Sequence, residues 1–385
     1  MVHHGDVAIL GIGTAVPRWR LDQADTALRL AEALRDNPGA ARWVRRIFRQ
    51  QGIESRHTCE PNLLENAGAC RYFPRSREAA PGTAERMAIY RREAPPLARL
   101  AAERALGSSG TPPEAVTHLI TVSCTGQYLP GLDAELVRAL GLPAGVVRVP
   151  FTFIGCAAGL KAVGLARQLV AASGDAEARA LVVCVELCTL HFQPSENRDD
   201  LFAASLFGDG ASACVIGAAA GGAAAVLRLG EPRSVLLPGG GTDMVWTVGD
   251  HGFELVLTAN VPKLIRAFLP GVIGPLAAGG GKPELWAIHP GGRGIIDAVE
   301  EVCALGPEQT RASREVLRRY GNLSSASILF VMDELLRERR ERGADAGEAG
   351  GLAVAFGPGL SAELLPFSLA GDPVRARGGR EAVHA

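Results

Sequence analysis

The chain has 385 residues, of which 47% are hydrophobic and 21% are charged, a composition typical of a globular protein with a sizeable core. Its formal net charge of −1 excludes a general attraction to nucleic acid or to anionic membranes, so an anionic ligand would need a local basic patch. No apolar run reaches the roughly 18–20 residues of a membrane span, and the first residues do not resemble a signal peptide. We expect a cytoplasmic protein with no membrane span and no nucleic-acid partner.

Eight cysteines are distributed along the chain, and none forms a Cys-x-x-Cys pair. Cys184 and Cys188 lie in a strand-like apolar run, which does not favour a zinc site. Several of the others lie in apolar segments typical of small buried side chains. We therefore predict no metal site, and we expect reduced thiols, one of which can act as a nucleophile.

Short apolar runs alternate with amphipathic ones along the first half of the chain, which is the pattern of an α/β protein. A run rich in Pro, Gly, Asn and Arg predicts an irregular segment over residues 61–81, and a fully apolar run predicts a strand buried on both faces over residues 180–186. The predicted strands are 7–12, 118–123, 146–153 and 180–186, and the predicted helices are 21–34, 41–50, 85–106, 132–140 and 156–172.

The second half repeats this alternation after a further strand at residues 212–217. The Ala/Gly-rich run 218–225 is the best boundary between halves, so we predict one unit over residues 1–220 and another over residues 221–385. The second unit has predicted strands at 224–229, 285–288 and 351–356 and predicted helices at 261–269, 294–303, 310–320 and 324–341. The Arg/Gly-rich tail from about residue 371 is expected to be frayed.

Cys156 follows a predicted strand and a glycine, and it opens a predicted helix. A thiol at a helix N-terminus lies near free backbone N–H groups and the positive end of the helix dipole, which favour the thiolate and lower the thiol pKa. The small residues around it would let a substrate approach. The alternative is a structural cysteine buried at a packed turn, and this motif alone does not decide between the two.

His289 and Asn322 are the other candidates for chemistry. His289 ends an apolar strand before Pro-Gly-Gly, which directs it toward the crevice where α/β proteins bind ligands. Asn322 precedes a long predicted helix. Taken singly, a core histidine and a helix N-cap are the simpler explanations.

A Cys, a His and an Asn together are sufficient for a decarboxylating Claisen condensation. The thiol holds an acyl group, and the imidazole and the amide stabilise the oxyanion of an enolate. Loss of CO2 from a malonyl thioester generates the carbanion directly, so no strong base is required. The imidazole can also pair with the thiolate.

Five motifs in order make a family resemblance specific. They are Gly155-Cys156-Ala157-Ala158-Gly159, Leu206-Phe207-Gly208-Asp209-Gly210-Ala211, His289-Pro290-Gly291-Gly292, Tyr320-Gly321-Asn322-Leu323-Ser324-Ser325-Ala326 and Ala355-Phe356-Gly357-Pro358-Gly359-Leu360. In type and order they resemble the landmarks of the type III polyketide synthases, the chalcone and stilbene synthase-like branch of the thiolase superfamily, here of a bacterial type. The resemblance runs over nearly the whole chain.

The resemblance implies a fold, an assembly and catalytic roles. The fold would be a thiolase-like α/β fold with αβαβα layers and two pseudo-equivalent halves, and the protein would be a homodimer. Cys156 would be the acyl-accepting nucleophile, and His289 and Asn322 the decarboxylation and oxyanion residues. Phe207 would be the gatekeeping phenylalanine, whose aromatic face desolvates the malonyl carboxylate; plain core packing is the alternative. CoA thioesters would be substrates, and no cofactor would be needed.

The resemblance also implies substrate-binding positions. Arg46, within a helical run of arginines, would contact the CoA phosphates, although a solvated basic face explains it equally well. Leu129 would reach across the dimer interface. The segment around Gly357 and Pro358 would shape the cyclisation cavity. The remaining substrate-binding candidates are Cys124, Thr125, His191, Leu255 and Ser324.

Two of these positions bear on the substrate. Cys124 occupies a place where bacterial members can carry a second cysteine, and a simple buried cysteine is the alternative. Leu255 stands near the position of a second gatekeeping aromatic residue, and an aliphatic side chain there would leave a more open route for a long acyl starter. We therefore expect a fatty acyl-CoA starter, iterative extension with malonyl-CoA, and cyclisation to alkylpyrones or alkylresorcinols.

Other readings are less consistent with the motifs. Gly11-Ile12-Gly13 begins like a dinucleotide fingerprint, but the third glycine is missing and Pro17 breaks the expected helix. An initiating β-ketoacyl synthase also uses Cys, His and Asn but usually has Gln-Ala-Asn after the His. A chalcone-synthase-like enzyme with an aromatic or malonyl starter remains open, and a silent thiolase-fold scaffold is disfavoured by the intact triad.

Overall fold

The computed structural model describes residues 7–74, 80–219, 227–237, 241–258, 260–277, 282–342 and 349–369. The predicted boundary between halves lies almost wholly outside these residues, and so does the predicted tail. Among the described helices, none has the length and apolarity needed to span a membrane.

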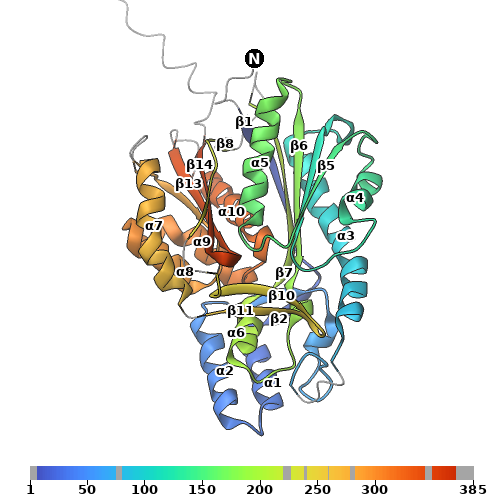
Figure 1. The fold of residues 1–385 in the computed structure, drawn as a ribbon, viewed down its shortest axis with the longest axis vertical. Helices are drawn as coiled ribbons and strands as arrows, with labels where there is room; N and C mark the ends of the chain where they lie inside the picture. Colours follow the sequence, from blue (N-terminus) through green and yellow to red (C-terminus); the bar gives the residue numbers. More distant parts are fainter. Residues whose placement is uncertain are drawn as a thin grey trace, which may run out of the picture.

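A mixed sheet of ten described strands forms the centre of the molecule, in the order β12-β13-β14-β8-β1-β7-β6-β4-β5, with β9 paired to β14 (Figure 1). Its N-terminal strands are β1 (Val7–Ala15), β4 (His118–Ser123), β5 (Val147–Thr152), β6 (Arg179–Leu187) and β7 (Asp209–Ala218). Its C-terminal strands are β8 (Leu227–Leu229), β9 (Arg233–Leu236), β12 (Leu285–Ile288), β13 (Ala349–Gly357) and β14 (Ser361–Leu369). The short strand β8 joins the two groups, because it pairs with both β1 and β14.

Helices lie between the two groups of strands and on their outer faces, which gives the expected five layers. Helices α5 (Ala158–Ser173) and α10 (Ser327–Arg342) lie in the middle, and their apolar residues form one core with the inward faces of both strand groups. Helices α3 (Thr83–Ser109) and α4 (Leu132–Leu140) cover the outer face of the N-terminal strands. Helices α7 (Val261–Ala277) and α8 (Arg293–Cys303) cover the C-terminal strands. The α/β thiolase-like fold is therefore confirmed.

Strand β6 shows why the sequence forms this core. Leu181, Val183 and Val185 belong to the core beneath α3, whereas Val182 and Cys184 belong to the core around α5. Side chains alternate between the two faces of a strand, so a strand between two helix layers must be apolar at every position. The buried polar exception on this strand is Glu186.

Several further elements lie at one end of the molecule, at the bottom of Figure 1. They include α1 (Gln23–Ala33), α2 (Pro38–Gln50), α6 (Arg198–Leu206), the pair β2 (Trp19–Asp22) and β3 (Ser55–Thr58), and the ribbon β10 (Met244–Gly249) and β11 (Gly252–Leu257). Helix α9 (Pro307–Tyr320) packs between β12 and α10. Short 3-10 turns complete the set at Pro61–Leu64, Pro113–Ala115, Cys188–His191, Ser324–Ala326 and Pro358–Leu360.

Most predicted elements exist with shifted ends. The predicted helix at residues 156–172 begins at Ala158, so Cys156 precedes the helix instead of opening it. The prediction missed β14 and α6. It also missed the ribbon β10–β11, which supplies one wall of the candidate site. It also missed β2, β3 and β9.

Candidate active site

Cys156 lies in the tight turn between β5 and α5. Gly155 has a positive φ of 87°, and a Cβ there would lie 2.0 Å from Cδ of Pro358. Only glycine fits this backbone and this close approach. The Gly155 N–H donates a hydrogen bond to Sγ of Cys124 over 2.9 Å, so the turn that presents the Cys156 thiol is held from both sides.

His289 follows the last residue of β12, and its main-chain N–H donates to the carbonyl of Val354 over 2.8 Å. Its side chain is 1% exposed. Neither ring nitrogen has a hydrogen-bond partner among the residues that the structure describes. A buried imidazole left without partners is costly, so this ring is available to a ligand in the cavity.

Asn322 lies directly after α9 and forms a parallel bridge with Phe207. Its Oδ1 accepts a hydrogen bond from the Ser324 N–H over 2.8 Å. Because the carbonyl end of the amide is used there, the NH2 end is the one left to donate elsewhere.

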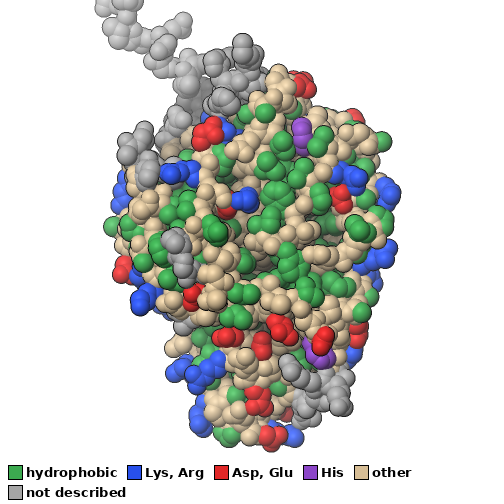
Figure 2. Space-filling view, viewed as in Figure 1, with side chains coloured by type: hydrophobic (Ala, Val, Ile, Leu, Met, Phe, Trp, Pro, Cys, Tyr) green, Lys and Arg blue, Asp and Glu red, His purple; other side chains and the backbone are tan. Residues whose placement is uncertain are grey.

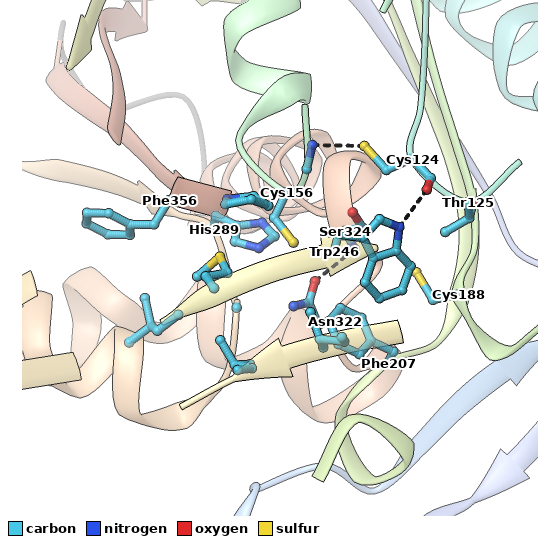
Figure 3. A pocket seen from close by; sticks show the side chains of 17 residues that line it. Cys124, Thr125, Cys156, Cys188, Phe207, Trp246, His289, Asn322, Ser324 and Phe356 are labelled. Carbon is cyan, nitrogen blue, oxygen red and sulfur yellow. Dashed lines mark hydrogen bonds between the residues drawn. The ribbon is translucent and has the colours of Figure 1, made fainter. Parts of the chain in front are cut away.

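These side chains line one small cavity that is partly open to solvent (Figure 3). Figure 3 shows the side chains of Cys156, His289 and Asn322 converging on it. The N-terminal half contributes Cys156 and Phe207, whereas the C-terminal half contributes His289 and Asn322. The full lining is Cys124, Thr125, Gly155, Cys156, Cys188, Phe207, Met244, Trp246, Leu255, Leu257, His289, Gly291, Ile295, Asn322, Ser324, Phe356 and Pro358.

One face of the ribbon β10–β11 forms the apolar wall of this cavity. Trp246 pairs across the ribbon with Leu255, and Met244 pairs with Leu257. Residues directly opposite on an antiparallel pair share a face, and all four line the cavity. The alternate residue Val256 is 40% exposed on the other face.

The family model for the N-terminal domain of chalcone and stilbene synthases matches residues 1–220, and the model for the C-terminal domain matches residues 231–368. The chain belongs to the chalcone and stilbene synthase family. It is a type III polyketide synthase and so an acyltransferase. That it is of a bacterial type stays a prediction.

Two solved structures are similar over nearly the whole chain. One is the C-terminal type III polyketide synthase domain of Steely1, a type I/III hybrid from Dictyostelium, with 28% identity, a TM-score of 0.85, and coverage of 95% of this chain and 100% of that one. The other is PKS-I from the brown alga Ectocarpus siliculosus, with 27% identity, a TM-score of 0.86, and coverage of 94% and 98%.

Four predicted substrate-binding residues lie away from the lining of this cavity. Leu129 is 90% exposed and borders a separate surface hollow. Arg46 is exposed on α2. Gly357 adjoins Pro358, and a Cβ there would lie 3.1 Å from Cβ of Ala157. His191 is 5% exposed and is not part of the lining.

His191 has no nitrogen left for a substrate. Its Nε2 is 2.7 Å from the Thr125 carbonyl, and its Nδ1 accepts from the Phe253 N–H over 2.9 Å. The ring stacks on Phe253 with centroids 4.2 Å apart. Burial lowers its pKa to about 3, so it is a neutral structural group that supports the ribbon.

Two functional neighbours were missed from the sequence. Trp246 lies in a segment for which the sequence predicts no element, and its Nε1–H donates to the Cys124 carbonyl over 3.0 Å. Glu186 is fully buried and accepts hydrogen bonds from the Cys124 N–H, the Thr125 hydroxyl and the Ser325 hydroxyl. Burial raises the pKa of Glu186 to about 7, although these hydrogen bonds oppose the rise. A buried acid within a single apolar strand was the signal available.

The ionisation of Cys156 and His289 differs from the expectation for a thiol at a helix N-terminus. Burial raises the pKa of the Cys156 thiol to about 11, against the lowering contacts of Ser324 and Asn322. Burial also lowers the pKa of His289 to about 3. The expected lowering of the thiol pKa was wrong because the helix begins beyond Cys156 and the turn is desolvated.

A single charge on either group is therefore disfavoured in this cavity. Proton transfer from the thiol to the imidazole creates both charges at once, without net charge, and each ion then stabilises the other.

No group of three or more described His, Cys, Asp or Glu side chains could hold a metal ion.

Removing the imidazole tests this coupling. In His289→Ala the thiol keeps its desolvation and loses its proton acceptor, so alkylation of Cys156 by iodoacetamide at pH 7 should fall roughly tenfold or more relative to wild type. Because the pKa of the Cys156 thiol is raised, the alkylation rate of this variant should climb as the pH rises toward about 11. Peptide mass spectrometry of Cys156 measures it.

The buried His191→Ala variant is the control for altered packing around the cavity, because His191 has no role in the proton transfer. Equal alkylation rates at pH 7 in His289→Ala and wild type would contradict the coupled pair.

Proposed function

We propose that the enzyme loads a fatty acyl-CoA on Cys156, extends it repeatedly with malonyl-CoA, and cyclises the chain to an alkylpyrone or alkylresorcinol. The observation that carries the proposal is the apolar wall of Trp246, Leu255, Met244 and Leu257 beside the thiol. An aliphatic chain gains free energy on such a wall at about 25 cal/mol per Å² of apolar surface buried.

The proposed cycle uses each group once per round. The Cys156 thiolate attacks the acyl-CoA carbonyl, the C–S bond to CoA breaks, and His289 holds the thiol proton until the CoA thiolate takes it. The C–C bond of malonyl-CoA then breaks beside Phe207. CO2 leaves, and the electron pair forms an enolate whose oxygen accepts hydrogen bonds from His289 and Asn322.

The enolate carbon next attacks the acyl-cysteine carbonyl. The bond to Cys156 breaks, the thiolate is restored, and His289 takes up one proton from solvent to replace the proton that left with CoA. The product is a β-ketoacyl-CoA longer by two carbons. Reloading of this product on Cys156 allows the next round. Ring closure follows when the chain is long enough to fold back on itself within the cavity.

A larger groove beside the cavity is the proposed path of the pantetheine arm. It shares Leu257, Gly291 and Ile295 with the cavity lining, and Trp43 and Ile47 of α2 border it. Figure 2 shows Lys and Arg side chains gathered over α2, at the lower left. Arg46 on this helix is our candidate for the CoA phosphates, since a guanidinium matches a phosphate with two hydrogen bonds.

A panel of starters tests the substrate. With malonyl-CoA, we expect medium- and long-chain acyl-CoA to give products with several added malonyl units and a ring, because the cavity wall is apolar. Mass spectrometry of the products measures this. Cys156→Ala is the control, and it should form none of them because no acyl group can be held.

Two other results of the starter panel would contradict the proposal. One malonyl addition without a ring would indicate an initiating β-ketoacyl synthase. Turnover of malonyl-CoA alone or of an aromatic starter, with fatty starters ignored, would refute the fatty acyl proposal.

Trp246 and Leu255 give a test in two directions. Trp246→Ala removes the largest side chain of the apolar wall, so it should admit longer starters or at least one further extension. Leu255→Phe adds volume on the facing strand and should shorten the longest starter accepted. Product analysis with the same panel measures both, and identical product sizes in the two variants would contradict a role for the ribbon in chain length.

We also propose a homodimer. Strand β5 is an edge of the sheet within the described residues, its first residue Val147 is 50% exposed, and Leu129 is 90% exposed. Figure 2 shows hydrophobic side chains over the middle of the face that is in view, near α5 and β5. Uncovered strand edges and apolar patches favour association with a second copy.

Sedimentation analysis tests the dimer. The wild type should sediment at twice 40.3 kDa, and Leu129→Asp should weaken dimerisation about tenfold or more by placing a charge in the contact. Leu28→Asp is the matched control, because Leu28 on α1 is 60% exposed and lies outside this face. A monomeric wild type, or equal effects of the two variants, would contradict the proposal.

A further inference from the structure

Phe207 and Asn322 are held together by main-chain hydrogen bonds, and Figure 3 shows both at one side of the cavity. The Asn322 N–H donates to the Leu206 carbonyl over 2.9 Å, and the Gly208 N–H donates to the Asn322 carbonyl over 3.0 Å. The two residues form an isolated parallel bridge. A shift of the backbone at Phe207 would therefore move Asn322 as well.

Arg56 on β3 braces this bridge from behind. It is fully buried, and its Nη1 donates to the carbonyls of Ala204 and Phe207 over 2.7 and 2.8 Å. These carbonyls lie at the C-terminal end of α6, where acceptors have no helical partner and a cation is favoured. The guanidinium thus holds the end of the helix from which Phe207 extends.

The stem of Arg56 packs against the other side of the bridge. A Cβ on Gly321, the residue before Asn322, would lie 2.8 Å from Cγ of Arg56, and a Cβ on Gly208 would lie 3.2 Å from its Cβ. Arg56 therefore fixes both segments, one by hydrogen bonds and one by contact. It is not among the residues that line the cavity.

The hydrogen bonds of Arg56 only partly compensate for the burial of its charge. Within the described residues, no carboxylate forms an ion pair with Arg56 and its Nη2 has no hydrogen-bond partner. Asp209 acts on it only at longer range, and its oxygens accept from Cys59 and Thr189. Burial lowers the pKa of Arg56 to about 9. An unpaired buried cation costs folding free energy that a well-packed apolar side chain would not.

We propose that Arg56 is a positioning residue that holds Phe207 and Asn322 in register for the decarboxylation step, without touching the substrate. The inference rests on the roles proposed above for these two residues. The Cys156 turn is held by separate contacts, through Gly155 to Cys124 and Pro358. Loss of Arg56 therefore impairs decarboxylation more than it impairs acyl loading.

Arg56→Lys is the variant that tests this. It keeps a positive charge but lacks the planar fork that serves two carbonyls and Gln23 at once. The rate of malonyl-CoA decarboxylation, measured by the release of CO2, should fall roughly 10- to 100-fold, as expected for a displacement of about 1 Å. The single-turnover rate of Cys156 acylation should fall less than about threefold. It is measured by intact-protein mass spectrometry with the acyl-CoA that wild type loads fastest.

Arg86→Lys is a matched control. Arg86 is also fully buried, its Nη1 also donates to two carbonyls, those of Leu190 and Phe192, and its Nη2 also has no partner among the described residues. Its hydrogen bonds do not reach the Phe207–Asn322 bridge. The ratio of decarboxylation to loading should stay at the wild-type value in this variant. An equal change of the ratio in both variants would refute the proposal.

A second variant covers the case in which Arg56→Lys does not fold. Gln23 accepts from Nε of Arg56 and donates to the Ser205 carbonyl, over 2.9 and 2.8 Å. Gln23→Leu should therefore lower the same ratio by a smaller factor.

An unchanged ratio in Gln23→Leu, or an equal loss of both steps in a folded Arg56→Lys, would overturn the positioning role. A wild type that does not decarboxylate malonyl-CoA would instead refute the proposed function itself.

Discussion

The close approach of two backbones between the halves is the constraint on which the active site depends. A Cβ on Gly159, in the first turn of α5, would lie 2.0 Å from the Ser325 carbonyl oxygen, and a Cβ on Gly155 would lie equally close to Pro358. Side chains at these positions would force the halves apart by more than packed interiors tolerate. The glycines on either side of Cys156 therefore set how near the thiol can come to His289 and Asn322.

That approach also sets the electrostatics of the site. Contact between the halves buries His289 and much of the surroundings of Cys156, and this burial raises the pKa of Cys156 and lowers the pKa of His289. The same burial strengthens the hydrogen bonds that we propose His289 and Asn322 make to an oxyanion. A resting pair with no net charge and the proposed stabilisation of the enolate thus have one cause, which is the burial of the site.

The sequence predicts the parts of this site that are carried by local motifs. The strand before His289 was placed at its observed bounds, and the motifs around Cys156 and Asn322 indicated one chemistry. Trp246 could not be placed, because the contribution of β10 and β11 depends on which face of an isolated ribbon meets the cavity. The hydrogen bonds of His191 could not be predicted, because its partners lie 62 and 66 residues away in the chain. The helix was expected two residues early, since small residues after Cys156 are compatible with either a turn or a helix.

The architecture separates the chemistry from the shape of the cavity. Cys156, His289 and the Phe207–Asn322 bridge are fixed by the central sheet, by α5 and by the buried Arg56. The apolar wall instead belongs to β10 and β11, which pair only with each other among the described strands. Substitutions of Met244, Leu255 or Leu257 change the room for substrate while the hydrogen bonds around Cys156 and Asn322 stay in place. Trp246 differs from them, because it also donates a hydrogen bond to the Cys124 carbonyl. A ribbon outside the main sheet can therefore change the accepted starter, whereas a change at Arg56 or at the glycines beside Cys156 alters the reaction itself.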